Sequence, residues 1–386
     1  MNAKRQLGQF FTTNSDYILS GFSKLVRSRN VRDPFAGSGE LVDWANKNGA
    51  RSVIGFDVDN SYVDNKTIFK NDSINNPKKY DFVLTNPPYL HKNKANENIK
   101  DKYFAGANSN FEDLYQVSIK SILNSKEGIV IVPLNFLSAE NSEKIRRIFF
   151  DKFTITRVNV FAEQVFNDTT YNVISFHYKE KNKNSNSVSM DTFLFPEKTK
   201  IKLELKKEFG WQMGGEFAAK INSTNNFLGI YRLTTDYLKD GPIKLRLAFN
   251  NIKNIETYNL DENLKHAIEK NILFLRAIDS KNGKKIQLED IRKYCVYGLV
   301  GKNTSRNMAH LLLRKPLTID EQKKLIVLFN KELRGAREKY SSLFLTNFRD
   351  NNRKRISFEF AYKLLNYIYL NKLYPRLENY KFNFGA

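Results

Sequence analysis

The sequence contains very little cysteine and histidine, and this scarcity excludes several kinds of protein. Cys295 is the single cysteine, so no disulfide can form within the chain, and a reducing cytoplasm is the expected compartment. The four scattered histidines give no spacing typical of a metal site. No apolar run is long enough to cross a membrane, and the first residues show no apolar core of a signal peptide. We therefore expect a cytoplasmic protein with no metal and no membrane partner.

Acidic residues are scarce relative to basic ones, but mainly in one half of the chain. The whole chain has 63 Lys and Arg against 41 Asp and Glu, a net charge of +22. Residues 1–180 carry a net charge of +4, and residues 181–386 carry +18. This asymmetry indicates a catalytic domain at 1–180 and a basic, nucleic-acid-binding domain at 181–386. A generally lysine-rich proteome is the alternative, but it would raise the charge of both halves.

Short apolar segments alternate with helical stretches in the first half, a pattern typical of doubly wound α/β domains. Only ten residues join the last two expected strands, too few for a helical crossover, so we expect an antiparallel hairpin there. The polar stretch 179–189 resembles a linker. Strands are expected at 31–35, 52–58, 80–86, 128–134, 155–161 and 172–178, and helices at 14–28, 39–48, 110–125 and 140–150.

The second half is less regular, and we expect a mixed α+β domain there. A helix is expected over 318–344. Within 348–374 we expect a basic segment followed by a second amphipathic helix that is rich in aromatic residues.

A glycine-containing loop, "DPFAGSGE" (33–40), follows the first expected strand. Gly37 and Gly39 allow a tight turn and a close approach of the backbone to a ligand, but the loop lacks the Lys-Ser/Thr end of a phosphate-binding P-loop. Asp57 ends the second strand and can accept hydrogen bonds from both hydroxyls of a ribose. Asp72 can accept one from an adenine amino group. Two acids that can bind a nucleoside, next to a loop that lacks the residues for binding phosphate, indicate a nucleoside cofactor without phosphates. S-adenosylmethionine is such a cofactor. The alternatives are a structural turn and two solvated loop acids.

The apolar segment "DFVLT" (81–85) of the strand expected at 80–86 runs directly into "NPPY" (86–89). Two consecutive prolines cannot continue a central strand, because they lack the N–H groups that a strand ladder requires. The chain therefore forms a stiff corner with an amide side chain on one side and an aromatic ring on the other.

Five motifs occur in an order that resembles a known family. "GQFFT" (8–12), "DPFAGSGE", "GFDVD" (55–59), "NDS" (71–73) and "NPPY" resemble motifs X, I, II, III and IV of the S-adenosylmethionine-dependent adenine-N6 DNA methyltransferases. The order is similar to that of the gamma class, typified by the Taq-type type II enzymes. The resemblance covers residues 1–180 and implies a Rossmann-like methyltransferase sheet. It also implies double-stranded DNA as substrate, a cognate restriction endonuclease as a candidate partner, and a monomer or weak dimer.

The resemblance gives the corner a chemical role. The exocyclic nitrogen of adenine is a poor nucleophile, because its lone pair is delocalised into the ring. The Asn86 side-chain oxygen and the Pro87 carbonyl can accept its two hydrogens, and Pro87 and Pro88 keep both acceptors in place. Tyr89 can stack on a flipped-out adenine. Phe166 matches the motif VIII aromatic that clamps the opposite face, although it can also be an ordinary core residue of the hairpin.

The same resemblance implies a set of cofactor-binding residues. Thr13 departs from the proline common in the family, and Ser73 from an adenine-stacking aromatic, for which Ile74 can substitute. The polar segment 90–110 is expected to be a mobile loop over the site. The implied cofactor-binding residues are Phe11, Thr12, Asp33, Pro34, Phe35, Ala36, Gly37, Gly39, Asp57, Asp72, Ser73, Asn86 and Pro88.

Two basic segments of the second half are candidates for DNA contacts. The cluster within 347–358 can contact phosphates, and the loop 297–307 can contact the DNA backbone or the bases. A solvated basic surface is the alternative for any one of these side chains. The candidate DNA-binding residues are Lys302, Arg306, Arg349, Arg353, Lys354 and Arg355.

Two other functions remain open at this point. An NPPY motif also occurs in methyltransferases that act on RNA adenine or on a glutamine amide of a protein, since each acceptor is a planar nitrogen. A non-catalytic nucleic-acid-binding protein that kept the fold is the other alternative, which the intact glycine loop and NPPY corner disfavour.

Overall fold

The computed structural model describes residues 12–166, 172–238, 240–280, 283, 285–347 and 353–375. The residues up to Gly215 form one compact unit, and those from Glu216 onward form a second. Two of the expected site residues, Phe11 and Arg349, lie outside the described residues.

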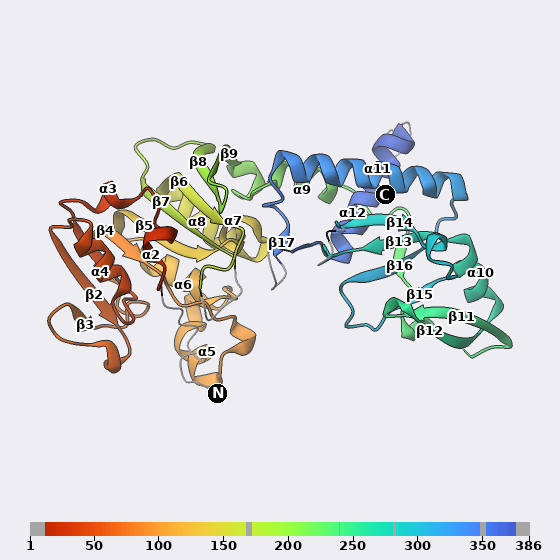
Figure 1. The fold of residues 1–386 in the computed structure, drawn as a ribbon, viewed down its shortest axis with the longest axis horizontal. Helices are drawn as coiled ribbons and strands as arrows, with labels where there is room; N and C mark the ends of the chain where they lie inside the picture. Colours follow the sequence, from red (N-terminus) through yellow and green to blue (C-terminus); the bar gives the residue numbers. More distant parts are fainter. Residues whose placement is uncertain are drawn as a thin grey trace, which may run out of the picture. The chain divides into compact units, whose positions relative to one another are not determined.

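The first unit is built on a nine-stranded mixed sheet (Figure 1) with the order β3-β2-β1-β4-β5-β7-β6-β8-β9. The strands from β3 to β5 are parallel, and β7 is antiparallel to both β5 and β6. The sheet confirms the doubly wound α/β fold and the terminal hairpin. The strands are β1 Asn30–Asp33, β2 Ser52–Asp57, β3 Ile68–Lys70, β4 Tyr80–Thr85, β5 Ser125–Pro133, β6 Phe153–Phe161, β7 Val173–Glu180, β8 Ser187–Phe195 and β9 Thr199–Lys206.

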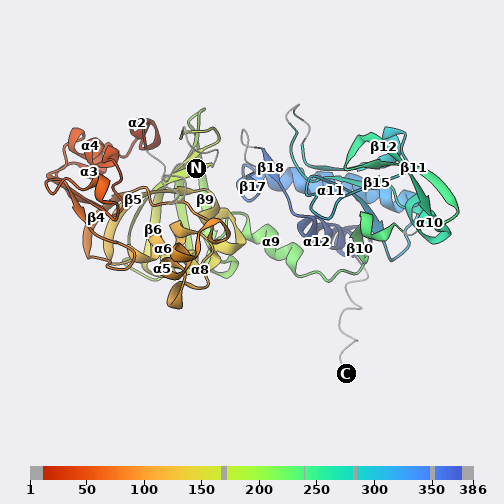
Figure 2. The ribbon, with the colours of Figure 1, turned by 90° about the horizontal axis from the view of Figure 1, so that it is seen from below.

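Helices cover both faces of this sheet. Figure 2 shows α2, α3 and α4 on one side of the strands and α5, α6 and α8 on the other. Right-handed crossovers in opposite directions from β1 require this arrangement. The helices are α2 Ser15–Ile18, α3 Ser23–Val26, α4 Glu40–Lys47, α5 Glu97–Tyr103, α6 Leu114–Ser121, α7 Asn135–Ser138 and α8 Glu143–Lys152.

The helix expected at 14–28 is two short helices instead. Gly21 separates them with a φ of 81°, a conformation that suits glycine. Side chains of β6 also take the carbonyl groups that a continuous helix would use. Arg157 and Asn159 each donate to the Ser20 carbonyl at 3.0 Å. These tertiary contacts end α2 at Ile18.

The first unit extends beyond the boundary expected at residue 180. The polar stretch 181–186 is a turn between β7 and β8, not a linker between domains. β8 pairs in parallel with β6, and β9 pairs with β8 as the edge strand. Because these two strands belong to the same sheet as β1, β2 and β4, the structure divides the chain at Gly215.

The second unit is a mixed α+β structure with three small sheets. Four strands form the order β10-β16-β13-β14, three form β12-β11-β15, and β17 pairs with β18. The strands are β10 Ile230–Arg232, β11 Ile243–Phe249, β12 Asn251–Leu260, β13 Leu273–Arg276, β14 Gln287–Asp290, β15 Leu299–Val300, β16 Met308–Leu313, β17 Thr346–Asn347 and β18 Lys354–Arg355.

The α-helices found among the described residues of this unit are α9 Gly215–Asn222, α10 Glu262–Lys270, α11 Ile319–Lys339 and α12 Phe358–Ile368. α11 begins with a capping box between Thr318 and Glu321 and packs Leu325, Phe329 and Leu333 into the largest core of this unit. α12 shares that core (Figure 1). No helix in the described part of the chain is long and apolar enough to span a bilayer.

Candidate cofactor and acceptor site

The main pocket of the first unit lies where the strand order reverses. β1 pairs in parallel with β2 on one side and β4 on the other. In open α/β sheets the crevice at the carboxyl ends of such strands is the usual ligand site. Asp33 ends β1, Asp57 ends β2, and Asn86 directly follows β4, so three polar side chains converge there. The pocket and its open mouth together enclose about 800 Å³ that is free of protein atoms, and part of this volume is open solvent.

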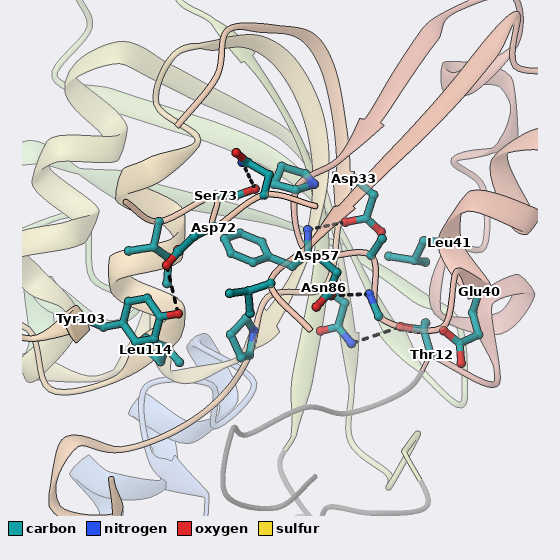
Figure 3. Close-up of a pocket in the computed structure, with 18 residues that line it drawn as sticks. Thr12, Asp33, Glu40, Leu41, Asp57, Asp72, Ser73, Asn86, Tyr103 and Leu114 are labelled. Carbon is teal, nitrogen blue, oxygen red and sulfur yellow. Dashed lines mark hydrogen bonds between the residues drawn. The ribbon is translucent and has the colours of Figure 1, made fainter. Parts of the chain in front are cut away.

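Eleven of the thirteen residues expected to bind a cofactor line this pocket. Gly39 is not part of the lining, and Phe11 is outside the described residues. Figure 3 shows Tyr103, Leu114 and Asp72 at one end of the pocket, and Thr12, Glu40 and Leu41 at the other. Asp57 lies between these two groups. The pocket therefore offers separate polar groups to the two ends of an elongated ligand.

Asp33 is a buried carboxyl with an unused oxygen. Its Oδ1 accepts hydrogen bonds from Phe35 N at 3.0 Å and from Thr85 Oγ1 at 2.6 Å. Its Oδ2 has no hydrogen-bonding partner among the described residues. Burial raises the pKa of Asp33 to about 7, although the two hydrogen bonds oppose the shift. A buried acceptor without a donor indicates a ligand group, because such atoms in native proteins are nearly always satisfied.

Asp57 holds the glycine loop in place. Its Oδ2 accepts from Gly37 N at 2.9 Å, and its Oδ1 accepts from Asp59 N at 2.7 Å. Gly37 and Gly39 have φ values of 51° and 92°, in the region that favours glycine. Burial raises the pKa of Asp57. Each carboxylate oxygen has a second lone pair for a ligand hydroxyl.

Asp72 follows β3 and receives donors from two elements. Lys102 Nζ lies 3.0 Å from Oδ2, and Tyr103 donates to the same oxygen at 3.3 Å. Asn75 contacts both oxygens, with its Nδ2 3.1 Å from Oδ2 and its backbone N 3.3 Å from Oδ1. The adjacent Ser73 hydroxyl accepts from Asn71 at 3.0 Å.

The Asn86 side chain is held at both ends. Its Nδ2 donates to Thr12 Oγ1 at 3.1 Å, and its Oδ1 accepts from the Tyr89 hydroxyl at 2.5 Å. The Tyr89 hydroxyl also lies 3.0 Å from the Ile131 carbonyl. Asn86 and Pro88 line the pocket, whereas Pro87 and Tyr89 are not part of its lining. The corner therefore brings a fixed amide to the edge of the pocket.

The two aromatic rings expected to clamp a base are in contact with each other. The ring centroids of Tyr89 and Phe166 are 6.5 Å apart with an interplanar angle of 66°. Both side chains are buried, with exposed fractions of 5% and 1%. A base stacked between them requires two nearly parallel rings, so these rings must rotate before a base can enter.

Several lining residues were missed by the sequence analysis. Glu40 begins α4 immediately after the glycine loop, and that position was a readable signal. Tyr103 and Leu114 gave no such signal. They belong to α5 and α6, in or beside the segment 90–110 that was expected to be a mobile loop. The structure instead folds residues 97–103 as a helix. The other lining residues not expected were Leu41, Val58 and Asn71.

The candidate DNA-binding residues of the second unit occupy different environments. Lys302 and Arg306 are exposed on the loop 301–307. Arg232 fixes this loop by donating to the carbonyls of Asn303 and Ser305, both at 2.6 Å. Its two exposed cations are thus presented by a backbone with defined geometry.

Lys354 does not fit the expected phosphate contact, because it is only 4% exposed. β18 carries it into the second unit beside the ion pair between the buried Asp279 and the partly buried Arg337. Burial lowers its pKa to about 8. Arg353 and Arg355 are half-buried, and Arg353 Nε donates to the Asp279 carbonyl at 2.7 Å.

Comparison with protein families gives one match that coincides with this site. The sequence profile of the Eco57I restriction-modification methylase family matches residues 37–166, about a third of the chain. The matched segment begins within the glycine loop and contains Asp57, Asp72 and the NPPY corner. It ends at Phe166. No functionally curated protein matches the sequence.

Solved structures with similar coordinates include restriction–modification proteins. The type I methyltransferase subunit from Streptococcus thermophilus is 18% identical, with 48% of each chain covered and a TM-score of 0.34. The EcoKI M protein is 16% identical, with 43% of this chain and 44% of that chain covered and a TM-score of 0.31. The type IIG restriction endonuclease BpuSI is 13% identical, with 62% and 37% covered and a TM-score of 0.39. The chain spans less than half of each of these proteins, and likeness at this level carries no information about the reaction.

S-adenosyl-L-methionine is the cofactor expected for a domain of the matched family, and the pocket residues fit it. The unused Oδ2 of Asp33 can face a cationic group of the methionine part. Asp57 and Asp72 provide acceptors for hydroxyl and amino groups. Among the described residues that line the pocket there is no Lys or Arg side chain.

Proposed function

We propose that this chain is a DNA methyltransferase that transfers a methyl group from S-adenosyl-L-methionine to N6 of an adenine in a specific duplex sequence. It resembles the gamma class and belongs to a restriction–modification system. The observation that carries the proposal is the Asn86 amide, which is fixed at the end of β4 and at the edge of the pocket that Asp33 and Asp57 also line. The family match over residues 37–166 supports a restriction–modification role.

The cofactor supplies an electrophilic methyl group, and the adenine N6 forms a bond to this carbon while the carbon–sulfur bond breaks. The chain's own residues make N6 a better nucleophile. The Asn86 oxygen and the Pro87 carbonyl accept the two N6 hydrogens, which favours a tetrahedral nitrogen with a localised lone pair. Because the corner is rigid, little reorganisation accompanies this step. After transfer the nitrogen is cationic and acidic, so it loses one proton to water without a strong base.

The target adenine must leave the DNA stack to reach Asn86. Entry of the base requires two changes at the corner. The Tyr89 hydroxyl must give up its bond to Asn86 Oδ1, and the Tyr89 and Phe166 rings must turn from their edge-to-face contact. The base then replaces the hydroxyl as the donor to Asn86. The basic second unit grips the duplex, with Lys302 and Arg306 on a fixed loop as candidate contacts.

The test is a tritiated-methyl transfer assay on unmethylated genomic DNA, followed by long-read sequencing of the product. We expect N6-methyladenine at one fixed sequence. Asn86→Ala is expected to lower kcat by about 10²–10³-fold, as removal of a preorganised catalytic hydrogen-bonding group does. Asn93→Ala, at an exposed position of the next segment, is the matched control and should retain activity. Label in RNA or in a protein glutamine, with none in duplex DNA, would contradict the proposed acceptor.

A further inference from the structure

The segment between the NPPY corner and α6 is anchored to the body of the first unit. Lys92 N donates to the Glu112 carbonyl at 2.7 Å, and Leu114 N donates to the Leu90 carbonyl at 2.9 Å. These two bonds close the segment at its base. Within it, the Asn96 side chain caps α5 by accepting from Ile99 N at 2.9 Å. The segment therefore has a defined structure in which α5 has a fixed position.

One face of α5 is directed into the first unit. Ile99 and Tyr103 are four residues apart and both are buried, as expected for neighbours on one helix face. Lys102 lies over the ring of Tyr103, with its Nζ 4.9 Å from the ring centroid. The last turn of α5 thereby brings Tyr103 and Lys102 to Asp72 at one end of the pocket, and Figure 3 shows the bond between Tyr103 and Asp72.

These contacts divide the roles of the two Asp72 oxygens. Oδ2 receives Lys102 Nζ, the Tyr103 hydroxyl and Asn75 Nδ2. Among the described residues, Oδ1 receives only the 3.3 Å bond from Asn75 N, and a carboxylate oxygen can accept two hydrogen bonds. Burial alone would raise the pKa of Asp72, but the hydrogen bonds from Lys102 and Asn75 lower it. The carboxylate is therefore charged at neutral pH and retains acceptor capacity on Oδ1.

We propose that Lys102 and Tyr103 are positioning residues for the nucleobase end of the cofactor pocket. They hold Asp72 charged and oriented, so that Oδ1 can accept from the amino group at C6 of the cofactor's purine. A purine with an oxygen at C6 would place an acceptor against this carboxylate, which is repulsive. The helix that follows the NPPY corner therefore determines which nucleobase the pocket accepts. The inference rests on the proposed function for the identity of the cofactor.

The test compares S-adenosylhomocysteine with S-inosylhomocysteine, whose bases differ in the group at C6 and in the hydrogen that the 6-oxo base carries at N1. Calorimetry on the full chain should show that the wild type prefers the adenosyl ligand by about 10–100-fold, the effect of a hydrogen bond to a charged group. Lys102→Met should weaken adenosyl binding by about tenfold and reduce the preference to within about threefold. Tyr103→Phe, which conserves the ring, should reduce the same preference by about two- to threefold.

Lys100→Met is the matched control, because Lys100 lies on the same helix but pairs with Glu97 at 2.7 Å instead of Asp72. It should leave both affinities unchanged. Lys102→Arg should restore most of the preference. Equal loss of both ligands in Lys102→Met, or an unchanged preference, would overturn the inference. Wild-type binding without a C6 preference would also overturn it. A wild type that shows the preference but does not methylate DNA would instead contradict only the proposed function.

Discussion

Replacing Asp33 by asparagine separates the cost of burying this carboxylate from its contribution to cofactor binding. The carboxyl is 1% exposed, and burial raises its pKa from 3.8 to about 7. In the unfolded chain the pKa of Asp33 is about 3.8. Between pH 3.8 and about 7 the folded state therefore binds more protons than the unfolded state. The stability contributed by this group therefore falls as pH rises from 3.8 to about 7, and it is constant above that range. At pH 8 the buried charge of Asp33 lowers the free energy of unfolding by about 4 kcal/mol.

Asparagine removes the charge and preserves most of the local bonding. Its oxygen can still accept from Phe35 N and Thr85 Oγ1, but its amino group then occupies the position of Oδ2. The position of Oδ2 has no hydrogen-bonding partner among the described residues, and an amide group left unsatisfied there costs about 1–3 kcal/mol. We therefore expect Asp33→Asn to stabilise the cofactor-free first unit by about 1–3 kcal/mol at pH 8. The gain should disappear at pH 5, where Asp33 in the folded wild type is already protonated.

Cofactor binding should change in the opposite direction. The variant loses the charged oxygen that faces the pocket, so its affinity for S-adenosyl-L-methionine at pH 8 should fall by about 10–100-fold. Urea unfolding at pH 5 and 8, with and without cofactor, measures both effects, and Asp43→Asn on the exposed side of α4 is the control. If Asp33→Asn destabilises the cofactor-free protein at pH 8, the argument that Asp33 is an uncompensated buried charge is refuted.

Three further predictions concern other parts of the chain. Arg337→Met should lower the unfolding free energy of the second unit by about 3–5 kcal/mol, because Asp279 remains buried without its bidentate partner. The double variant Arg337→Met, Asp279→Asn should regain part of the lost unfolding free energy, as measured by urea unfolding. Lys302→Ala should reduce the slope of log affinity for DNA against log salt by about 1, whereas buried Lys354→Met should leave it unchanged in fluorescence titrations. Tyr89→Phe should keep activity within about tenfold in the methyl transfer assay, since the ring remains and only the hydroxyl bond to Asn86 is lost.

The sequence predicts four of the five parallel strands, β1, β2, β4 and β5, because each is a short apolar segment bounded by polar residues or a turn, whereas the three-residue β3 was not among the expected strands. Asp33, Asp57 and Asn86 end or follow strands in the sequence, and the parallel sheet brings these ends to one edge. The convergence of these residues is thus a direct consequence of strand direction. The pocket end at Tyr103 could not be predicted in this way, because α5 is short, polar on its outer face and positioned by tertiary bonds to Glu112 and Asp72.

The boundary between the two units was predicted incorrectly for a different reason. The polar composition of 179–189 is equally compatible with a linker and with a turn between strands. The segments "SVSMDTFLF" and "TKIKLELK" do alternate polar and apolar residues, and this alternation is the signal of half-buried strands. Val188, Met190, Leu203 and Leu205 are the buried members. Periodicity beyond the polar stretch was therefore a better guide to the boundary than its composition.

The basic cluster at 353–355 shows why charge density alone does not define a binding surface. Successive side chains of a β-strand point to opposite faces, so three consecutive cations cannot all face one phosphate backbone. In the structure Arg353 and Arg355 are half-buried and Lys354 is fully buried, which is the alternation that the strand requires. Burial lowers the pKa of Lys354 to about 8, and the attraction of the nearby Asp279 carboxylate, which is paired with Arg337, opposes this shift. The loop 301–307 has fewer charges in sequence, yet its backbone is fixed by Arg232 and its cations are exposed. For this reason the loop, and not the denser cluster, is where substitutions should alter DNA binding without altering stability.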